Sequence, residues 1–441
     1  MKALDLSHSK NLRKIPDFED IPKLEQLKLE GCEKLVQMDP SMGVLRKLVV
    51  LNLKHCRNLA SIPNIIFGTS SLKELNLSGC RKVFKNPRKL KKLDSNESSY
   101  SQSKTSSILK RTTFCYHSLY PNTHKDLDSC LLPSLLSLSC LYELDISFCG
   151  LNQLPDAIGC LHLLEKLKLG GNNFVTLPSL RELSKLVYLN LEHCKLLECL
   201  PRLSFPSVFE DRKEYRETGL LIFNRPKLGE RESCSSLIFS WMIHIIQACP
   251  QFYTGSSGRT IDIVIPGSEL SIWFNNQSES DSIRFDPSPI MHDNDNNIIG
   301  ICCCAVFTVE PVDPTMTKYA KRPPKIRLGI SNYRSTQTNR GDWSDNILVI
   351  LDRDLIAVKS DHMWLMYFPR ERFLNITRLV DGTLNHVHDF NLTVFTENGE
   401  GLNLELQNCG YQWVYKQDHA SLQKLLSLEL QVNEAQPQSF D

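Results

Sequence analysis

The chain has 441 residues, of which 41% are hydrophobic and 23% are charged. These fractions are typical of a folded globular protein and exclude a wholly disordered or membrane-filling chain. The 51 Lys and Arg residues and the 50 Asp and Glu residues leave a formal net charge of +1, which excludes the broad basic footprint of non-specific nucleic-acid binding.

The N-terminal residues MKALDLSHSK alternate apolar and polar side chains and contain no apolar signal segment, so we expect a cytoplasmic or nuclear protein. In that setting the 16 cysteines are expected to be reduced thiols. The longest apolar stretch, over 237–249, is shorter than the roughly 20 residues that a membrane-spanning helix needs. We therefore expect no membrane span.

A repeated pattern organises residues 1–205. The pattern L-x-x-L-x-L-x-x-(C/N) occurs in six full copies after a shortened copy that opens the chain, and the full copies start at Leu24, Leu48, Leu72, Leu141, Leu164 and Leu186. Uninterrupted starts lie 22 to 24 residues apart, which is the period of leucine-rich repeats. The pattern therefore predicts an α/β leucine-rich-repeat solenoid.

Each L-x-L core predicts a short strand whose Leu side chains point inward and whose intervening residues point outward. Stacked repeats bury the Leu side chains in a continuous spine and leave a concave face. The outward residues form two expected ladders on that face: Asp5, Lys28, Asn52, Asn76, Asp145, Lys168 and Asn190 in the first, and Gln26, Val50, Glu74, Glu143, Lys166 and Tyr188 in the second.

We expect this mixed polar face to bind another macromolecule, because its residues form no ordered catalytic set. Interfaces draw most of their binding energy from a few aromatic and Arg side chains. The expected aromatic anchors are Tyr188 on the second ladder and Phe148 beside the fifth strand. The expected polar contacts are Lys28, Asn52, Lys168 and Asn190.

Five cysteines recur at one position of the repeat: Cys32, Cys56, Cys80, Cys149 and Cys194. We favour a structural role, in which a small buried Cys or Asn satisfies backbone groups of the turn after the strand. A metal site is less favoured because zinc sites use paired C-x₂-C spacings, and these repeats contain none.

Residues 81–133 interrupt the repeats as an irregular insertion. The insertion begins with a basic run over 81–92 and continues into a Ser-rich segment over 95–107, whose composition cannot bury a core. We favour a solvated repeat edge for the basic run. A nuclear-entry or phosphate-contacting patch stays open as the alternative.

After residue 205 the repeat pattern ends. We expect a linker and capping helix over 206–255, an all-β sandwich over 256–430 and a disordered tail over 431–441, because short β-rich runs alternate with turn signals in the sandwich region. The expected strands are 261–265, 282–285, 298–309, 325–331, 346–351, 362–368, 387–396 and 411–415. The turn-rich segment 332–345 carries the last candidate contact residues, Tyr333, Arg334, Arg340 and Trp343.

Two constellations in the second half could suggest chemistry. Cys302, Cys303 and Cys304 lie in one expected strand, where neighbours point to opposite faces, so we expect core packing and no shared metal. Asp361 and His362 resemble half of a catalytic dyad, but the sequence has no G-x-S-x-G nucleophile turn. We therefore expect no enzyme activity, no metal and no cofactor.

The segments LNLKHCRNLASIP, LNLSGC and LVYLNLEHCKLLECLP resemble plant intracellular disease-resistance receptors of the TIR, nucleotide-binding, leucine-rich-repeat class, in particular legume proteins similar to the tobacco mosaic virus resistance protein. The second half resembles the post-repeat domain of that class (C-JID), a jelly-roll and immunoglobulin-like module. The matching segments are IDIVIPGSELSIWF, SDHMWLMYFPRERF and CGYQWVY, although Ser271 stands where the family pattern has Pro.

This resemblance implies the effector-recognition and autoregulatory part of an immune receptor. Its expected partners are a pathogen effector protein and, in a full receptor, the receptor's own nucleotide-binding domain. The sequence contains no G-x-x-x-x-G-K-[ST] phosphate loop and no TIR module, so we expect a truncated receptor without the family's nucleotide switch or NAD cleavage. The alternative is a generic or extracellular leucine-rich-repeat protein for adhesion or scaffolding.

Overall fold

The computed structural model describes most of the repeat region and the strands and helices of the second half. The described residues are 1–15, 17–63, 66, 71–84, 135, 137–206, 217–223, 233–271, 273–280, 282–286, 288–311, 325–332, 347–350, 361–377, 389–396 and 402–417. The candidate contact residues Tyr333, Arg334, Arg340 and Trp343 lie outside them, as do residues 85–133 of the expected insertion.

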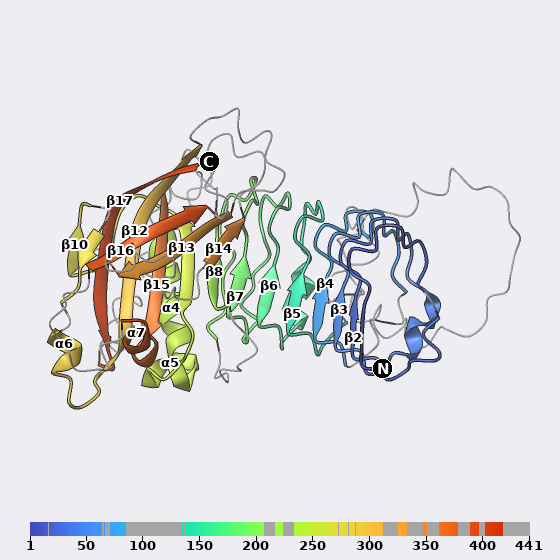
Figure 1. The fold of residues 1–441 in the computed structure, drawn as a ribbon, viewed down its shortest axis with the longest axis horizontal. Coiled ribbons are helices and arrows are strands. Elements are labelled where there is room, and N and C mark those ends of the chain that lie inside the picture. Colours follow the sequence, from blue (N-terminus) through green and yellow to red (C-terminus); the bar gives the residue numbers. More distant parts are fainter. Residues whose placement is uncertain are drawn as a thin grey trace, which may run out of the picture. The chain divides into compact units, whose positions relative to one another are not determined.

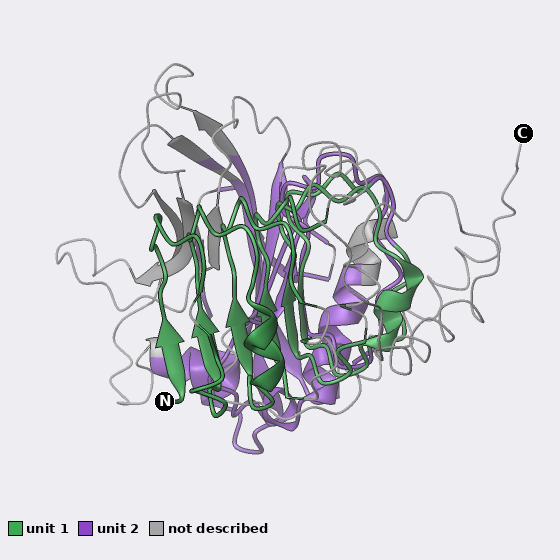
Figure 2. Cartoon of the chain, turned by 90° about the vertical axis from the view of Figure 1, so that its right-hand side faces the viewer, with its two compact units in different colours: residues 1–174, 178–183 green, residues 175–177, 184–441 purple. Residues whose placement is uncertain are grey.

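The chain divides into two compact units (Figure 2). Unit 1 comprises Met1–Phe174 and Pro178–Leu183, and unit 2 comprises Val175–Leu177 and Ser184–Asp441. The expected domain boundary at residue 205 therefore falls inside unit 2. The boundaries of the expected domains otherwise stay a prediction.

Unit 1 is a stack of short parallel strands, each contributed by one repeat (Figure 1). In chain order they are β1 (Ala3–Asp5), β2 (Gln26–Lys28), β3 (Val50–Asn52), β4 (Glu74–Asn76), β5 (Glu143–Asp145) and β6 (Lys166–Lys168). Each strand pairs with the next at the same repeat position. This register confirms the leucine-rich-repeat solenoid, and the direct pairing of β4 with β5 shows that the insertion adds no strand between them.

The Leu spine forms the core of unit 1. Leu27, Leu51 and Leu167 are fully buried at the centres of their strands, with 0% of their surface exposed. Leu4, at the centre of the first strand, is only half-buried. Two 3-10 helices, η1 (Pro40–Val44) and η4 (Asp156–Cys160), return the chain between strands.

Unit 2 contains two sheets. The larger has the order β7-β8-β9-β15-β12-β17-β10, with β7, β8 and β9 parallel and the remaining pairs antiparallel. Its strands are β7 (Tyr188–Asn190), β8 (Gly219–Leu221), β9 (Ile261–Pro266), β10 (Asn276–Ser278), β12 (Ile298–Pro311), β15 (His362–Pro369) and β17 (Leu402–Tyr415). The smaller, antiparallel sheet has the order β11 (Ser282–Arg284), β16 (Asp389–Thr396), β13 (Lys325–Asn332) and β14 (Ile347–Ile350).

The helices of unit 2 are α4 (Ser233–Ala248), α5 (Pro250–Thr254), α6 (Ser288–Met291) and α7 (Arg370–Thr377). The capping helix expected within 206–255 corresponds to α4, which contains nearly all of the apolar stretch 237–249 and begins four residues before it. None of the helices in the described part of the chain has the length and hydropathy of a membrane-crossing segment.

All eight strands expected in the second half have a counterpart, but β17 begins nine residues before the expected range 411–415, and β8 and β10 were missed. β8 lies inside the expected linker, where a three-residue strand leaves too short a periodic signal. It continues the parallel repeat pairing to β9. Only Gly fits at the first residue of β8, because φ at Gly219 is 140° and a Cβ atom would lie 1.8 Å from the Asp262 carbonyl oxygen.

Aromatic and aliphatic side chains of the larger sheet form the core of unit 2. One cluster includes Ile301, Cys303 and Phe307 of β12, which share a face of that strand. Cys302 and Cys304 point to the other face and are also buried. This alternation confirms the prediction that the three cysteines pack in the core.

Candidate interaction face of the repeats

The first ladder lies in register along the strands of unit 1. Asp5 pairs with Lys28, Lys28 with Asn52, and the same column continues through Asn76, Asp145 and Lys168. The Leu residue one position earlier in each strand is the inward one. The outward positions that the sequence predicted are therefore confirmed throughout unit 1.

Most side chains of this ladder also close the turn that follows their strand. A side-chain oxygen accepts a hydrogen bond from the backbone N–H two residues later, which is the geometry of an Asx turn. The pairs are Asp5 with Ser7 at 2.9 Å, Asn52 with Lys54 at 3.0 Å, Asn76 with Ser78 at 3.0 Å, Asp145 with Ser147 at 3.0 Å and, in unit 2, Asn190 with Glu192 at 2.9 Å. The ladder is therefore partly structural, a role that the sequence analysis missed although Asp and Asn before a turn are its usual signal.

The two lysines of the ladder lack this turn role. Lys168 Nζ lies 3.3 Å from a Glu143 carboxylate oxygen, and Lys166 Nζ approaches the other oxygen at 3.9 Å. The Lys28 side chain is half-buried, and its ammonium group forms no hydrogen bond and no ion pair within 4.0 Å among the described residues, although its charge helps to lower the pKa of Asp5. Lys28 is thus the ladder cation that is available to a partner.

Accessibility changes along the face. Asp5 and Gln26 are exposed, and Val50, Asn52, Glu74 and Asn76 are half-buried, as in an open strand face. On the last two strands of unit 1, Asp145 and Lys166 are buried, with only 8% and 5% of their surface exposed to solvent. Glu143 and Lys168 stay half-buried on these strands, so the part of the face on which every ladder residue is exposed or half-buried is the outward surface of β1 to β4, which we term the β1–β4 face.

A difference in burial also gives Asp5 and Asp145, which occupy equivalent ladder positions, opposite shifts in pKa. Hydrogen bonds from Ser7 lower the pKa of the exposed Asp5 carboxyl. Burial raises the pKa of Asp145, even though Ser147 donates to it in the same way and Lys168 is nearby. A buried carboxyl in this turn therefore destabilises the fold when it is charged.

The recurring cysteines act as predicted. Four of the five thiols donate to a backbone carbonyl of the preceding repeat: Cys32 to Leu6 at 3.2 Å, Cys56 to Leu29 at 3.1 Å, Cys80 to Leu53 at 3.0 Å and Cys149 to Leu77 at 3.2 Å. At the same repeat position Asn172 donates to the Ile146 carbonyl at 3.0 Å. Burial raises the pKa of the Cys56 and Cys149 thiols to about 12, so they stay protonated donors.

In each repeat of unit 1, the residue just before the position of the recurring Cys or Asn adopts a positive φ. These residues alternate between a ring and a glycine: His8, Gly31, His55, Gly79, Phe148 and Gly171. Each ring lies against the glycine of the next repeat, with His8 Nδ1 and His55 Nδ1 both 2.8 Å from where a Cβ atom would be. Phe148, expected as an anchor for a partner, is half-buried in this contact with Gly171.

Tyr188 corrects the sequence-based expectation. It is only 6% exposed and belongs to the core cluster of unit 2, with Leu221, Phe223 and Val264. The prediction that Tyr188 is an exposed anchor outside the core is therefore wrong. The neighbouring candidate Asn190 closes its turn and donates from Nδ2 to a Glu192 carboxylate oxygen at 2.6 Å.

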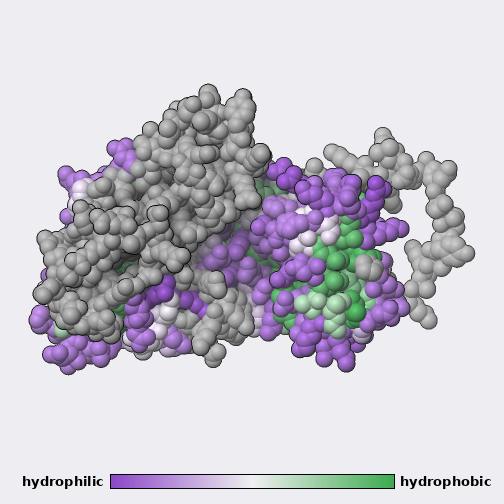
Figure 3. All heavy atoms as spheres, in the orientation of Figure 1, coloured by the Kyte–Doolittle hydropathy of each residue, from purple (hydrophilic) through white to green (hydrophobic). Residues whose placement is uncertain are grey.

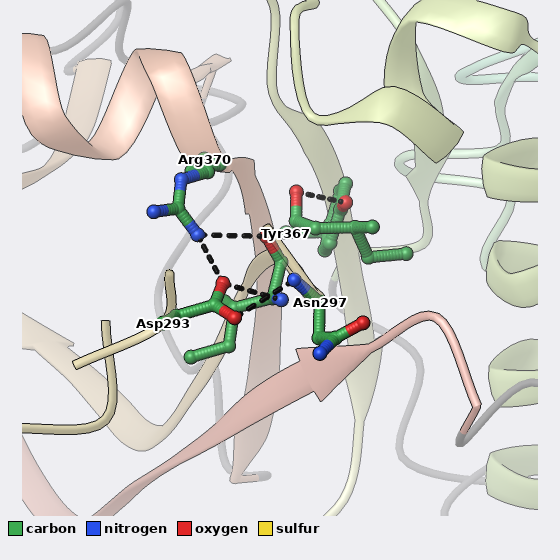
Figure 4. Close-up of polar contacts among 6 residues, drawn as sticks. Asp293, Asn297, Tyr367 and Arg370 are labelled. Carbon is green, nitrogen blue, oxygen red and sulfur yellow. Dashed lines mark hydrogen bonds and ion pairs between the residues drawn. The ribbon is translucent and has the colours of Figure 1, made fainter. Parts of the chain in front are cut away.

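A second polar cluster, in unit 2, surrounds Asp293 (Figure 4). Its carboxylate accepts the backbone N–H groups of Asn297 and Ile298, both at 2.8 Å, and forms an ion pair with Arg370. Burial alone would raise the pKa of Asp293, but these hydrogen bonds and Arg370 outweigh it and hold the pKa below its ordinary value. Since the acid is fully engaged by groups that join α7 to the start of β12, the cluster is structural.

Tyr367 adds further hydrogen bonds next to the Asp293 cluster. Its hydroxyl lies 3.0 Å from the Ile299 carbonyl oxygen and 3.2 Å from the Phe252 carbonyl oxygen, which puts both within hydrogen-bond distance. Burial raises the pKa of this hydroxyl well above its ordinary value. In the described residues no group of three or more His, Cys, Asp or Glu side chains is arranged to hold a metal ion.

No protein-family model matches the chain. It is 25% identical over 270 residues to the disease resistance-like protein DSC1 of Arabidopsis thaliana, an alignment that covers 56% of this chain and 22% of DSC1. It is 46% identical over 48 residues to the disease resistance protein RML1B of Arabidopsis thaliana, covering 11% of this chain and 5% of that protein. It is 40% identical over 47 residues to the disease resistance protein RUN1 of Vitis rotundifolia, covering 11% and 4%.

These relatives are plant disease resistance proteins of the TIR, nucleotide-binding, leucine-rich-repeat class. The chain spans about a fifth of the length of DSC1 and less of the others. The resemblance seen in the sequence to this class is therefore confirmed, while the finer likeness to the legume group stays a prediction.

Solved structures of leucine-rich-repeat proteins are also similar. The Leptospira interrogans protein LIC12759 is 18% identical, covers 54% of this chain and 56% of its own, and has a TM-score of 0.26. The ectodomain of the Arabidopsis thaliana receptor kinase GASSHO1/SCHENGEN3 is 16% identical, covers 51% and 36%, and has a TM-score of 0.19. These scores are low, and the fold assignment rests on the strand register of unit 1.

Proposed function

We propose that this chain is the effector-recognition and autoregulatory part of an intracellular plant immune receptor, acting by protein–protein binding in the cytoplasm or nucleus. The observation that carries the proposal is the accessible β1–β4 face, a regular strand surface on a chain that is similar to plant disease resistance proteins. Because the chain spans a fifth of DSC1, we assign the TIR and nucleotide-binding functions of such a receptor to other segments.

The β1–β4 face suits a protein partner. Val50 offers an apolar centre between the second-ladder residues Gln26 and Glu74. Among the described residues Lys28 offers a cation without a close ion pair, and Asn76 keeps its Nδ2 donor without a partner. Because the strands and Asx turns already hold these groups in place, a partner orders little of the surface on binding, which lowers the entropic cost of association.

Autoregulation adds an energetic requirement. An effector can release a receptor only when it binds the released state more tightly than the restrained state. We therefore propose that the effector and the receptor's own nucleotide-binding domain compete for overlapping parts of the repeat unit. No catalytic step is assigned to this chain, and we propose that it neither hydrolyses ATP nor cleaves NAD.

We further propose that unit 2 contains the jelly-roll and immunoglobulin-like post-repeat domain of this receptor class, over 256–430. Support comes from the three segments that resemble that domain, which fall in or beside β9, β15 and β17. β15 pairs with β9, and β12 lies between β15 and β17. Segments that are far apart in the sequence are thus brought into one sheet.

Affinity capture from infected leaves tests the proposal. The chain, a face variant with Lys28→Glu and Val50→Asp, and a control with Lys47→Glu outside the ladders are expressed in leaves, and the captured proteins are identified by mass spectrometry. We expect a pathogen-encoded protein with the unaltered chain and the control, and its loss with the face variant. Capture of host cell-surface or matrix proteins alone favours the adhesion alternative, and equal capture by all three chains excludes the β1–β4 face.

A further inference from the structure

A basic edge of unit 1 is separate from the β1–β4 face. It is formed by the four turns that follow β1 to β4, over 8–11, 31–34, 55–58 and 79–82. These turns hold five Lys or Arg residues and one acidic residue, Glu33. The five Lys and Arg residues are all exposed, and we term them the basic ridge: Lys10, Lys34, Arg57, Arg81 and Lys82. In Figure 3 the edge of unit 1 at which the strands end is hydrophilic.

The ridge is built by equivalent positions of successive repeats. Lys10, Glu33 and Arg57 each donate their backbone N–H to the carbonyl two residues earlier, at 2.8 to 2.9 Å, which places them at one point of the turn. Arg81 occupies the same sequence position after Cys80. Neighbouring strands of a sheet lie about 4.8 Å apart, so this row presents a side chain about every 5 Å.

Cross-repeat hydrogen bonds hold the second row. Lys34 Nζ donates to Asn11 Oδ1 and Lys82 Nζ donates to Asn58 Oδ1, both at 2.7 Å. Asn58 in turn donates to the Glu33 carbonyl at 2.7 Å. Neutral Asn side chains therefore hold the ammonium groups of Lys34 and Lys82 in place without neutralising the positive charge of the two lysines.

Negative charge on the ridge is sparse. Glu33 approaches Lys10 only at 3.9 Å, with both side chains largely exposed. The Arg57 guanidinium forms no hydrogen bond or ion pair with the described residues, and Arg81 Nε donates only to the Phe148 carbonyl, at 3.2 Å. Both guanidinium groups keep N–H donors with the fork geometry that binds carboxylates in a bidentate manner.

We propose that the basic ridge binds an extended acidic peptide segment of a partner protein, with its carboxylates on Arg57 and Arg81. An extended chain presents a side chain on one face about every 7 Å, a spacing that flexible Arg and Lys side chains on successive turns can follow. A protein segment is favoured over single-stranded nucleic acid because the four turns contain no Phe, Tyr or Trp for base stacking. A phosphate backbone is also disfavoured by Glu33 within the row.

Fluorescence anisotropy of the full chain with a short labelled peptide of alternating Glu and Gly tests the proposal. The ridge variant carries Arg57→Glu and Arg81→Glu. The control carries Arg46→Glu and Lys47→Glu, an equal charge change on two exposed residues in the turn before β3. Circular dichroism melts establish that both variants are folded. A labelled single-stranded oligonucleotide and phosphatidylserine vesicles are measured in parallel.

We expect the peptide to bind the unaltered chain and the control alike, to bind the ridge variant about tenfold or more weakly, and to dissociate as salt is raised. Equal weakening in the ridge variant and the control would reduce the effect to net charge and overturn the proposal. Absence of peptide binding would also overturn the proposal. Tighter binding of the oligonucleotide or of the vesicles than of the peptide would overturn it too, and would indicate that the ridge binds phosphate groups. None of these outcomes bears on the β1–β4 face.

Discussion

The ring of Phe148 lies against the backbone of Gly171 in the next repeat, so closely that a Cβ atom at Gly171 would lie 2.2 Å from Phe148 Cδ1. His8 with Gly31 and His55 with Gly79 repeat the contact earlier in unit 1. The solenoid therefore has a structural period of two repeats, in which every second repeat supplies a ring and the next supplies the space for it.

Gly171→Ala is expected to destabilise unit 1 through two additive causes. The positive φ of 65° costs a residue with a side chain roughly 1–2 kcal/mol, and the clash with Phe148 adds about 1–3 kcal/mol. Gly150 provides the matched control, because its φ is 71° and nothing lies within 4 Å of its Cβ position. Urea unfolding of both variants should show the larger loss for Gly171→Ala.

Phe148→Ala combined with Gly171→Ala separates the two causes. Removing the ring should eliminate the clash and leave the cost of the positive φ, so the combined loss should be smaller than the sum of the single losses. Strict additivity of the two losses would show that the ring does not occupy the space above Gly171.

Leu51→Asp and Leu167→Asp are expected to unfold at least the neighbouring repeats. Both side chains are fully buried, and an unpaired carboxylate at either position costs more than about 4 kcal/mol. Lys28→Ala, on the accessible face, should cost about 0.5 kcal/mol or less. Thermal melts compare the three variants, and equal melting temperatures would refute the strand register.

Asp145→Asn is expected to stabilise the protein at neutral pH. Asn can accept the Ser147 N–H as Asn76 accepts the Ser78 N–H, and it removes a buried charge. Burial raises the pKa of Asp145 above its ordinary 3.8, so the folded protein favours the protonated carboxyl. The folded state is therefore not penalised by this carboxyl below pH 3.8, and it loses stability as pH rises and the carboxyl ionises. The gain in Tm should thus be about 2 °C or more near pH 7 and smaller below pH 3.8.

Asp5→Asn serves as the control for that measurement. Asp5 closes the same turn but is exposed, and hydrogen bonds from Ser7 lower its pKa. The folded state therefore favours the ionised carboxylate of Asp5. This carboxylate stabilises the fold above pH 3.8, the ordinary pKa of Asp, and the stabilisation is lost as pH falls. No gain in Tm at neutral pH is expected, and a gain equal to that of Asp145→Asn would contradict the role of burial.

The repeat cysteines are expected to resist alkylation in the folded chain. Cys56 and Cys149 are buried, and their thiol pKa of about 12 leaves almost no thiolate at about pH 8. Among the cysteines whose burial the structure describes, Cys160 is the exposed one and should react with iodoacetamide first. Peptide mass spectrometry before and after denaturation measures this order. Labelling of Cys56 as fast as Cys160 would mean that the thiol is not buried in the repeat turn.

Much of unit 1 follows from the sequence by itself. The spacing of Leu24, Leu27 and Leu29 determines which residues of a repeat point inward, and the same spacing in each copy determines the pairing register. The slot filled by Cys56 or Asn172 is likewise local, because the side chain contacts backbone of the adjacent repeat. Period and local geometry are encoded within each repeat, so the sequence predicts them well.

Only the tertiary structure decided which outward residues are accessible. Tyr188 has the same outward position as Gln26, yet it is buried in the core of unit 2, while Gln26 is exposed. Asp145 and Asp5 differ in the same way. A period of two specifies the direction of a side chain from its strand, whereas burial depends on which distant segments pack against it. The hydrophobic pattern of a single repeat contains no information about those segments, so the accessible face emerges only from the assembled fold.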